Sequence, residues 1–297
     1  MNHSRDASFL SISTALRAYA AGDAFGVAYE FTEFSEVSDD LLAKDGWPYG
    51  GVSDDSLLTL LTLATINSSP KIAAAEFLKS LHSAAPSLRG LGPTTRHALG
   101  MSVKESEGHL IGKSNGGMMR TALSGLAFDL EDAQSRRDFV NESVRTTHFA
   151  VEAVIGAQIA AALFAHAVAG SGATMSEIIE QEIAADTNLS VELRDRLTAR
   201  ESWTPPSEGI SLDPIETLFA FTFVADRNTT VLGAYKDACR LKGDTDTVSA
   251  LSGSLVAARF GEASQFQSIP WLDDIQWDEI STLDSIIELV YRKRNQR

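Results

Sequence analysis

The sequence predicts an all-α protein in which residues 1–297 form a single domain. Apolar residues recur at three- and four-residue steps along most of the chain, whereas the strict apolar–polar alternation typical of strands is nearly absent. The composition is 44% hydrophobic and 22% charged, which is ordinary for a globular protein long enough to bury a large core. The Gly- and Pro-rich breaks are short, and no internal repeat or long linker divides the chain.

The expected helices follow from this spacing and from the breaks between them. The first lies around residues 10–19, and the second begins at Ser53-Asp54-Asp55-Ser56, because Ser and Asp are favoured at the start of a helix. Turn-forming residues at 46–48, 69–70, 112–117, 170–172 and 203–209 separate the helical stretches. Further helices are predicted over 70–84, 93–103, 117–129, 149–169, 174–185, 190–200, 212–225, 230–241, 246–259 and 278–292.

Residues 149–170 are long and apolar enough to be mistaken for a membrane span. Glu152, Gln158 and His166 interrupt this segment, and polar groups are costly in lipid. Its many alanines also suit the centre of a helical bundle, where neighbouring helices approach closely. We therefore expect a buried helix here and no membrane partner.

Charge and cysteine content restrict the function and the location. The chain has 25 Lys and Arg against 40 Asp and Glu, and its formal charge of −15 opposes binding to a nucleic-acid backbone. Cys239 is the only cysteine, so neither an internal disulfide nor a cysteine-based zinc cluster can form. The N-terminal residues lack the apolar run of a secretory signal. These features predict a cytoplasmic protein with no nucleic-acid partner.

Two acidic clusters, each at the start of a predicted helix, indicate a metal site. The first is Ser53 to Ser56, which ordinary helix capping would explain if it stood alone. The second, Gly243 to Thr247, has the sequence GDTDT, and its two carboxylates and adjacent hydroxyls offer the oxygen ligands that Mg²⁺ and Mn²⁺ prefer. A calcium loop is excluded, because position 255 is Leu where that loop needs a Glu. Together the clusters suit two metal ions a few Å apart.

Six short motifs stand in a fixed order along the chain. They are Ala21-Gly22-Asp23-Ala24-Phe25-Gly26 with Glu30, Ser53-Asp54-Asp55-Ser56, Arg89-Gly90-Leu91-Gly92-Pro93-Thr94-Thr95, Ser114-Asn115-Gly116-Gly117-Met118-Met119-Arg120, Thr147-His148, and Gly243 to Thr247 followed by Ile269-Pro270. In type and order they resemble the GDALG…E, TDDT, RGxGxxT, SNGxxMR, TH and GDTDT segments of the ADP-ribosylglycohydrolase family. That family includes the dinitrogenase-reductase-activating glycohydrolase and the ADP-ribosyl-acceptor hydrolases.

The resemblance implies a compact orthogonal helical bundle with two Mg²⁺ or Mn²⁺ ions at the base of an ADP-ribose cleft. The implied metal ligands are Ser53, Asp54, Asp55, Asp244, Asp246 and Thr247. The implied ligand-binding residues are Gly92, Ser114, Asn115, Gly116, Gly117 and His148. The loop at 112–117 is an ordinary turn by composition, but before a helix its backbone N–H groups can also hold a diphosphate.

The reaction implied by the resemblance is hydrolysis of the bond between C1″ of ADP-ribose and an acceptor, commonly an arginine or serine side chain. Breaking a glycosidic bond builds positive charge on the ribose, so the enzyme needs nearby negative charge and a positioned water. Glu30, Asp54 and Asp55 are the candidate catalytic carboxylates, and the division of roles among them stays open.

Three departures from the family pattern stand out. Serine replaces both threonines of TDDT, at positions 53 and 56, and Ser53 keeps the hydroxyl oxygen. Val52 stands where many members carry an aromatic residue, which predicts an altered contact with the acceptor. Lys242 stands where the family usually has Gly, and we expect it either to compete with a metal ion or to disturb the backbone before Asp244.

The leading hypothesis is therefore a metal-dependent ADP-ribosyl hydrolase that acts on an ADP-ribosylated protein or a small ADP-ribose conjugate. The alternatives are a hydrolase of another ADP-ribose ester, a non-catalytic ADP-ribose-binding protein, and a toxin-neutralising protein. Retention of every carboxylate among the implied metal ligands favours an active enzyme.

Overall fold

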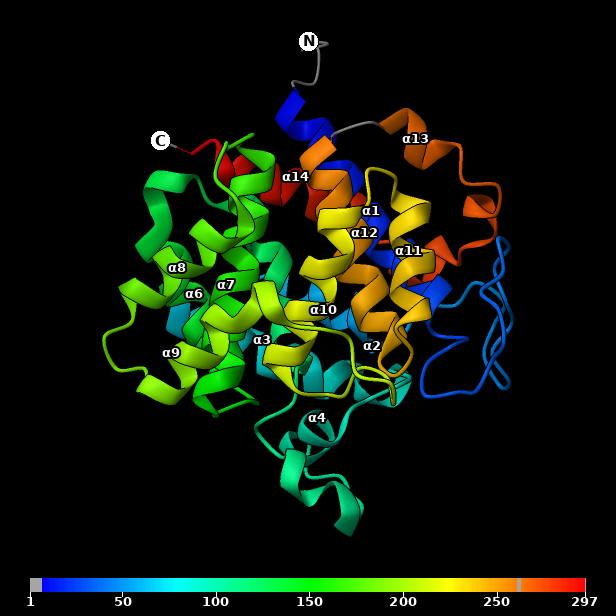
Figure 1. Cartoon of the computed structure of the whole chain (residues 1–297), viewed down its shortest axis with the longest axis horizontal. Helices are drawn as coiled ribbons and strands as arrows, with labels where there is room; N and C mark the ends of the chain where they lie inside the picture. Colours follow the sequence, from blue (N-terminus) through cyan, green and yellow to red (C-terminus); the bar gives the residue numbers. More distant parts are fainter. Residues whose placement is uncertain (1–6, 261–262, 297) are drawn as a thin grey trace.

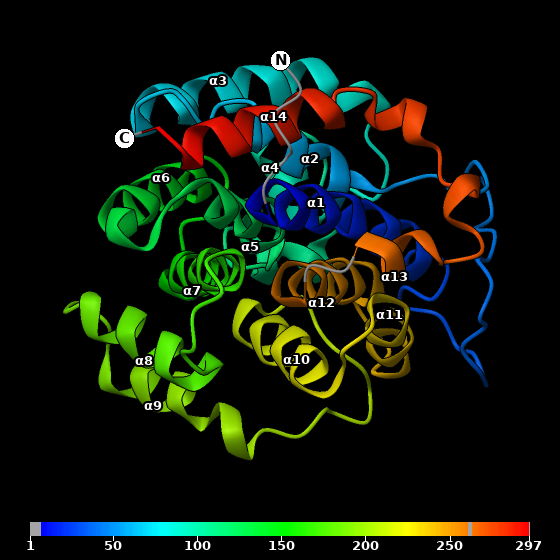
Figure 2. The ribbon, with the colours of Figure 1, turned by 90° about the horizontal axis from the view of Figure 1, so that it is seen from above.

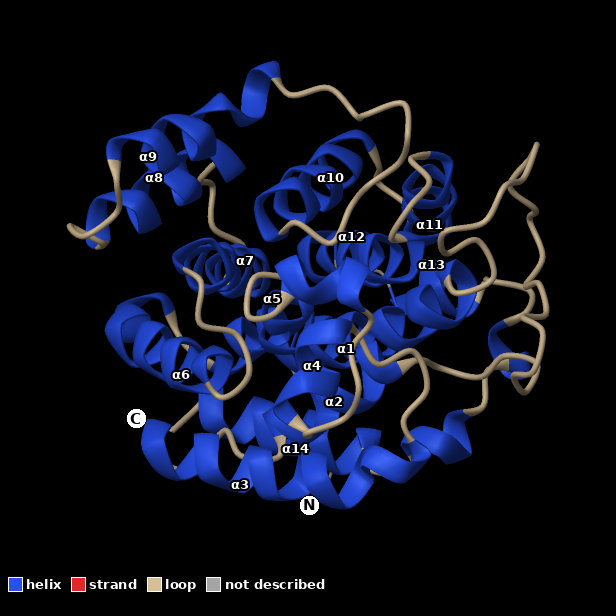
Figure 3. Ribbon diagram, turned by 90° about the horizontal axis from the view of Figure 1, so that it is seen from below, coloured by secondary structure: helices blue, strands red, loops and turns tan. Residues whose placement is uncertain are grey.

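The computed structural model describes residues 7–260 and 263–296, and within these ranges the regular elements are helices, as predicted (Figures 1 and 3). The one β contact in this part of the chain is an isolated bridge between Ile210 and Gly243. The α-helices are α1 (Ala7–Gly26), α2 (Asp54–Leu63), α3 (Pro70–Ala84), α4 (Pro93–Ala98), α5 (Gly116–Thr121), α6 (Ala133–Arg145), α7 (Val151–Val168), α8 (Met175–Ala185), α9 (Val191–Thr198), α10 (Pro214–Arg227), α11 (Val231–Arg240), α12 (Thr245–Phe260), α13 (Ala263–Gln267) and α14 (Leu283–Arg294).

Helix α1 lies in the middle of the molecule and packs directly against α12 (Figure 2). Small residues allow this close approach: a methyl group on Gly26 would come within 2.4 Å of the Thr245 carbonyl oxygen. The Thr245 hydroxyl donates to the Gly26 carbonyl at 2.8 Å, and Ser254 Oγ donates to the Ala15 carbonyl at 2.8 Å. The C-terminal end of α1 is therefore fixed against the start of α12, where the second acidic cluster lies.

The apolar segment over residues 149–170 contains α7, which lies among α5, α6, α8, α10 and α12 (Figure 2). By length and composition α7 could cross a membrane, but 67% of its 18 residues are buried inside the protein. Its fully buried residues include Ala157, Ala160 and Ala161. It is thus a central core helix, as expected.

Two helices and several boundaries differ from the sequence expectation. The apolar pattern predicts no helix over 133–145, where α6 lies. On this helix Arg136 is buried beside Phe139 and Val140, and a charged residue at a buried position interrupts the apolar pattern. The Arg136 guanidinium is ion-paired with Glu182 of α8 at 2.6 Å, so a polar side chain occupies a core position. The short α13 is also unpredicted, and the helix expected over 93–103 ends at Ala98. The stretch expected over 117–129 is α-helical only to Thr121 and continues as a 3-10 helix over Ala122–Ala127, and the α-helix expected over 278–292 begins at Leu283.

Candidate metal centre

The start of α2 is organised by Asp23, a buried residue in the last two turns of α1. Its carboxylate accepts hydrogen bonds from the backbone N–H of Ser53 (3.1 Å), and from both the backbone N–H (3.1 Å) and the hydroxyl (2.5 Å) of Ser56. Ser53 is the N-cap of α2, since its Oγ accepts from the Asp55 N–H at 3.0 Å. The two acidic residues Asp54 and Asp55 are thereby held in the first turn of α2.

The second cluster lies at the start of α12, after two successive residues with left-handed backbone. Lys242 has φ +61° and Gly243 has φ +77°. A side chain at Gly243 would collide with the Ile210 carbonyl oxygen, 2.0 Å from the Cβ position, so only glycine fits this turn. Asn115 then fixes Asp244, because its amide donates to Asp244 Oδ2 and to Thr217 Oγ1 (2.9 Å).

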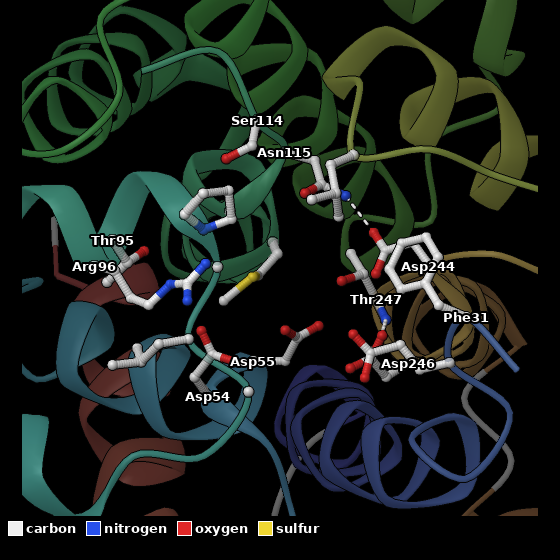
Figure 4. Close-up of a pocket in the computed structure, with 18 of the residues that line it drawn as sticks. Phe31, Asp54, Asp55, Thr95, Arg96, Ser114, Asn115, Asp244, Asp246 and Thr247 are labelled. Atoms are coloured by element: carbon white, nitrogen blue, oxygen red, sulfur yellow. Dashed lines mark hydrogen bonds between the residues drawn. The ribbon is translucent and has the colours of Figure 1, made fainter. Parts of the chain in front are cut away.

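The two clusters face each other across a cavity of about 220 Å³ (Figure 4), and Glu30 also lines this cavity. One carboxylate oxygen each from Glu30, Asp244 and Asp246 lies within 4.8 Å of the other two. Asp54 and Asp55 of α2 line the same cavity. Five carboxylates from three segments far apart in sequence thus converge on one small volume.

Burial raises the pKa of every aspartate in and behind this cavity. The pKa of Asp23 and of Asp244 rises to about 6, in each case chiefly because the side chain is buried, and for Asp244 also because of the negative charge of Glu30. For Asp54, Asp55 and Asp246 the pKa is raised well above the usual range, first by burial and then by neighbouring carboxylates. A site that concentrates buried carboxylates in this way favours a bound cation.

The donor set fits divalent metal ions. All the groups that face the cavity from the two clusters are oxygen donors, which suits Mg²⁺ or Mn²⁺. Asp55 Oδ2 is fully buried and has no hydrogen-bond partner, although buried carboxylate oxygens are normally satisfied. An oxygen in this condition is available as a metal ligand.

Most of the residues implied by the family resemblance line this cavity, and three lie behind its wall. Those on the wall are Glu30, Asp54, Asp55, Gly92, Ser114, Asn115, Gly116, Asp244, Asp246 and Thr247. Those behind it are Ser53, whose hydroxyl caps α2, Gly117, which packs against His148, and His148 itself.

His148 is fully buried and therefore differs from the expected direct ligand contact. Its Nε2 lies 3.1 Å from Ser114 Oγ, and its Nδ1 lies 2.8 Å from Thr147 Oγ1. Burial, together with the nearby charge of Arg120, lowers the pKa of His148 to about 3, so the ring is neutral. His148 therefore supports the cavity wall indirectly, through the Ser114 hydroxyl and through Gly116, against which its ring lies.

The three departures from the family pattern are placed by the structure. Ser53 caps α2 as described, and Val52 is fully buried and does not line the cavity, so the altered acceptor contact expected there is not made by its side chain. The ammonium of Lys242 lies 3.4 Å from the exposed carboxylate of Glu33, which removes it from competition with a metal ion. The effect of Lys242 is on the backbone, where it adopts the left-handed conformation that favours glycine.

Sequence reasoning missed several residues of the site. Asp23 lies inside the GDAFG motif, and the available signal was an acidic residue in an otherwise apolar stretch of sequence. Lys44 does not line the cavity, but its Nζ is ion-paired with Glu30 Oε2 at 2.6 Å. Phe31 and Arg96 line the cavity from opposite sides (Figure 4), and no motif signal singled them out.

Comparison with known proteins extends over nearly the whole chain. The family model described as ADP-ribosylglycohydrolase matches residues 8–296. A solved structure titled "ADP-ribosylglycohydrolase-related protein complex" is 25% identical in sequence and superposes with a TM-score of 0.72, covering 96% of this chain and 98% of that one. A search of curated proteins finds no significant match.

Proposed function

The chain belongs to the ADP-ribosylglycohydrolase family, and from this premise we propose that it is a metal-dependent hydrolase that removes ADP-ribose from a modified arginine or serine side chain. The observation that carries the proposal is the convergence of Glu30, Asp54, Asp55, Asp244 and Asp246 on one cavity. We assign two Mg²⁺ or Mn²⁺ ions to this cavity. Their proposed ligands are Ser53, Asp54 and Asp55 from one cluster and Asp244, Asp246 and Thr247 from the other.

Bound there, the metal ions supply Lewis acidity and coordination positions for the ribose hydroxyls. The carboxylates of the chain stabilise the positive charge that develops on the ribose ring as its bond to the acceptor breaks. Glu30 is the half-buried member of the set and is held by Lys44, so we assign it to accept the proton of the attacking water. The proton that Glu30 takes up is then available for the departing acceptor, and Asp54 and Asp55, ionised as metal ligands, contribute negative charge.

The test is release of free ADP-ribose from arginine-linked and serine-linked ADP-ribosyl peptides, with Mg²⁺, with Mn²⁺ and with a chelator. We expect metal-dependent release from one of the two peptides. Asp54→Asn and Asp246→Asn each remove one proposed ligand charge without changing side-chain size, and we expect each to lower the rate by more than about 100-fold. Wild-type rates in either variant would contradict the two-metal proposal.

Other results would select a different function. Binding of ADP-ribose with no release from either peptide would favour a non-catalytic binder or a toxin-neutralising role. Release from an acetylated ADP-ribose, with neither peptide cleaved, would favour hydrolysis of another ADP-ribose ester. Circular dichroism of each variant is the control, because an intact helical spectrum separates lost chemistry from lost folding.

A further inference from the structure

A second cavity, of about 260 Å³, lies at the opposite end of α12 from the candidate metal centre. Its lining residues come from α7, α8, α12 and the turn between α7 and α8. Asp246 at the start of α12 lines the first cavity and Arg259 near its end lines the second, so the two residues lie roughly 20 Å apart along the helix. Much of the second wall is apolar, with the side chains of Leu163, Ala167, Met175, Ile178, Leu255 and Phe260.

The wall of this second cavity is positively charged, in contrast to the chain as a whole. Among its described lining residues none is acidic and Arg259 carries a full charge, whereas the chain has a formal charge of −15. The Nη1 atom of Arg259 lies 3.6 Å from Oδ1 of Asp226, but Oδ2 of Asp226 accepts from Arg200. Arg200 also contacts the sulfur of Met175, on the cavity wall, at 3.7 Å. Two arginines therefore share one carboxylate beside the cavity, and one positive charge is left for a ligand.

Arg259 also has donors to offer. Its Nη1 donates to the Ala225 carbonyl at 3.3 Å, and within the described residues its guanidinium makes no other hydrogen bond. The side chain is 36% exposed, so its remaining N–H groups are not sealed inside the protein. A guanidinium presents paired N–H donors that match the two oxygens of a carboxylate.

His166 and Ser171 add a neutral polar pair to the wall. His166 Nδ1 lies 2.9 Å from Ser171 Oγ, and this oxygen accepts from the Ala173 N–H at 3.1 Å. Burial lowers the pKa of His166, and the charge of Arg136 lowers it further, so the ring is neutral at pH 7. A ligand in this cavity thus meets one cation, two neutral hydrogen-bonding groups and an apolar surface.

We propose that this cavity binds a small amphipathic carboxylate. The carboxylate pairs with Arg259, and an apolar body of about six carbons lies against Leu163 and Leu255, because the volume is just below that of common ligand pockets. A single excess positive charge matches a monoanion better than a phosphate dianion. The site is independent of the proposed hydrolase function, since none of its residues belongs to the candidate metal centre.

Titration of ¹⁵N-labelled protein with sodium hexanoate in the presence of a chelator tests the proposal. We expect saturable amide shifts that are largest within residues 163–178 and 255–260. Hexan-1-ol has the same chain length without the charge, so it should bind at least about tenfold more weakly, and hexylammonium should not bind. Equal binding of the alcohol would overturn the choice of a carboxylate. The absence of saturable shifts up to about 20 mM hexanoate would overturn the site itself.

Two variants test the two parts of the site. Arg259→Met removes the charge and should weaken hexanoate binding by about tenfold, with no change for hexan-1-ol. Ala167→Phe fills the cavity without a change in charge and should abolish the binding of both. Arg227→Met, which removes an exposed arginine of α10 outside the cavity, is the matched control and should bind hexanoate like the wild type.

The amide spectrum of each variant shows whether its fold is intact, and affinities are compared among folded proteins. Equal affinities in Arg259→Met and Arg227→Met would overturn the assignment of Arg259. Wild-type affinity in Ala167→Phe, or shifts centred on the residues around Asp246, would show that hexanoate binds elsewhere and would overturn the inference.

Discussion

Asp244→Asn should make the metal-free protein more stable while it removes the stabilisation that metal ions provide. Asp244 is buried, and its carboxylate lies near those of Glu30 and Asp246. Without a metal ion, this negative charge opposes folding. An asparagine has the same shape and its Oδ1 still accepts the hydrogen bond from Asn115, so the substitution removes the charge with little change in packing.

The magnitude follows from the pKa of Asp244. A rise from 3.8 to about 6 in the folded protein means that the ionised carboxylate destabilises the metal-free fold by about 3 kcal/mol at pH 7.5. An Asp with a raised pKa stabilises the folded state at low pH, and this stability is lost as the pH rises from 3.8 through about 6. Asp244→Asn has no titrating carboxyl group at this position, so its stability does not fall in this way as the pH rises. Because the new amide also needs partners, we expect Asp244→Asn to gain roughly 1–3 kcal/mol at pH 7.5 and less at pH 5.

Urea unfolding in a chelator at pH 5 and pH 7.5 measures this difference. Comparing variant with wild type cancels the opposing effect of His148, whose lowered pKa is present in both proteins. Mg²⁺ should then stabilise the wild type by about 3 kcal/mol at a hundredfold excess over its Kd and should leave the variant almost unchanged. Asp40→Asn on an exposed loop is the control and should change neither. A metal-free Asp244→Asn protein less stable than the wild type at pH 7.5 would refute the reasoning.

Three further substitutions test the structure around the site. Asp23→Asn replaces an acceptor oxygen that serves Ser56 with an N–H donor, so calorimetry should show weaker Mg²⁺ binding by at least about tenfold, although Asp23 is not a proposed ligand. Lys242→Gly should raise the free energy of unfolding by about 1 kcal/mol in urea, because it relieves a left-handed lysine. Gly26→Ala should lower the thermal midpoint and the Mg²⁺ affinity together, since the added methyl group would collide with the backbone at Asp246.

The periodicity of the sequence was sufficient for the fold class and for most helices, because an apolar stripe is a local property. Periodicity did not predict α6, because the charge of its buried Arg136 is paired with Glu182 of α8, and this ion pair exists only in the folded protein. The end of α4 at Ala98 was missed for a different reason: Gly100, with φ +70°, stands just after this end, and the apolar pattern alone does not register such a glycine. Local patterns therefore predict helices that bury apolar faces and miss those held by a paired charge.

The same limit applies to the candidate site: residues within one motif were predicted from the sequence, whereas residues that reach the site from another part of the fold were not. Residues in contiguous motifs, such as Asp54 and Asp246, were identified because each motif places several oxygens together within the sequence. Asp23 organises one of these motifs from another helix, and Arg96 comes to line the same cavity as the carboxylates only through the fold. The sequence shows which groups are present, but the sign of the charge around each group is a property of the tertiary structure.

Holding five like charges in a small cavity requires a scaffold that cannot relax away from them. The glycines of α1 and α12 meet this requirement, because a Cβ on Gly22 would lie 2.8 Å from the Ser249 carbonyl oxygen and one on Gly253 would lie 2.0 Å from the Tyr235 ring. Helices in such close contact separate only at a large loss of packing energy. The repulsion among the carboxylates is therefore retained in the folded protein, where it favours cation binding, and the same small residues that build the core sustain the candidate metal centre.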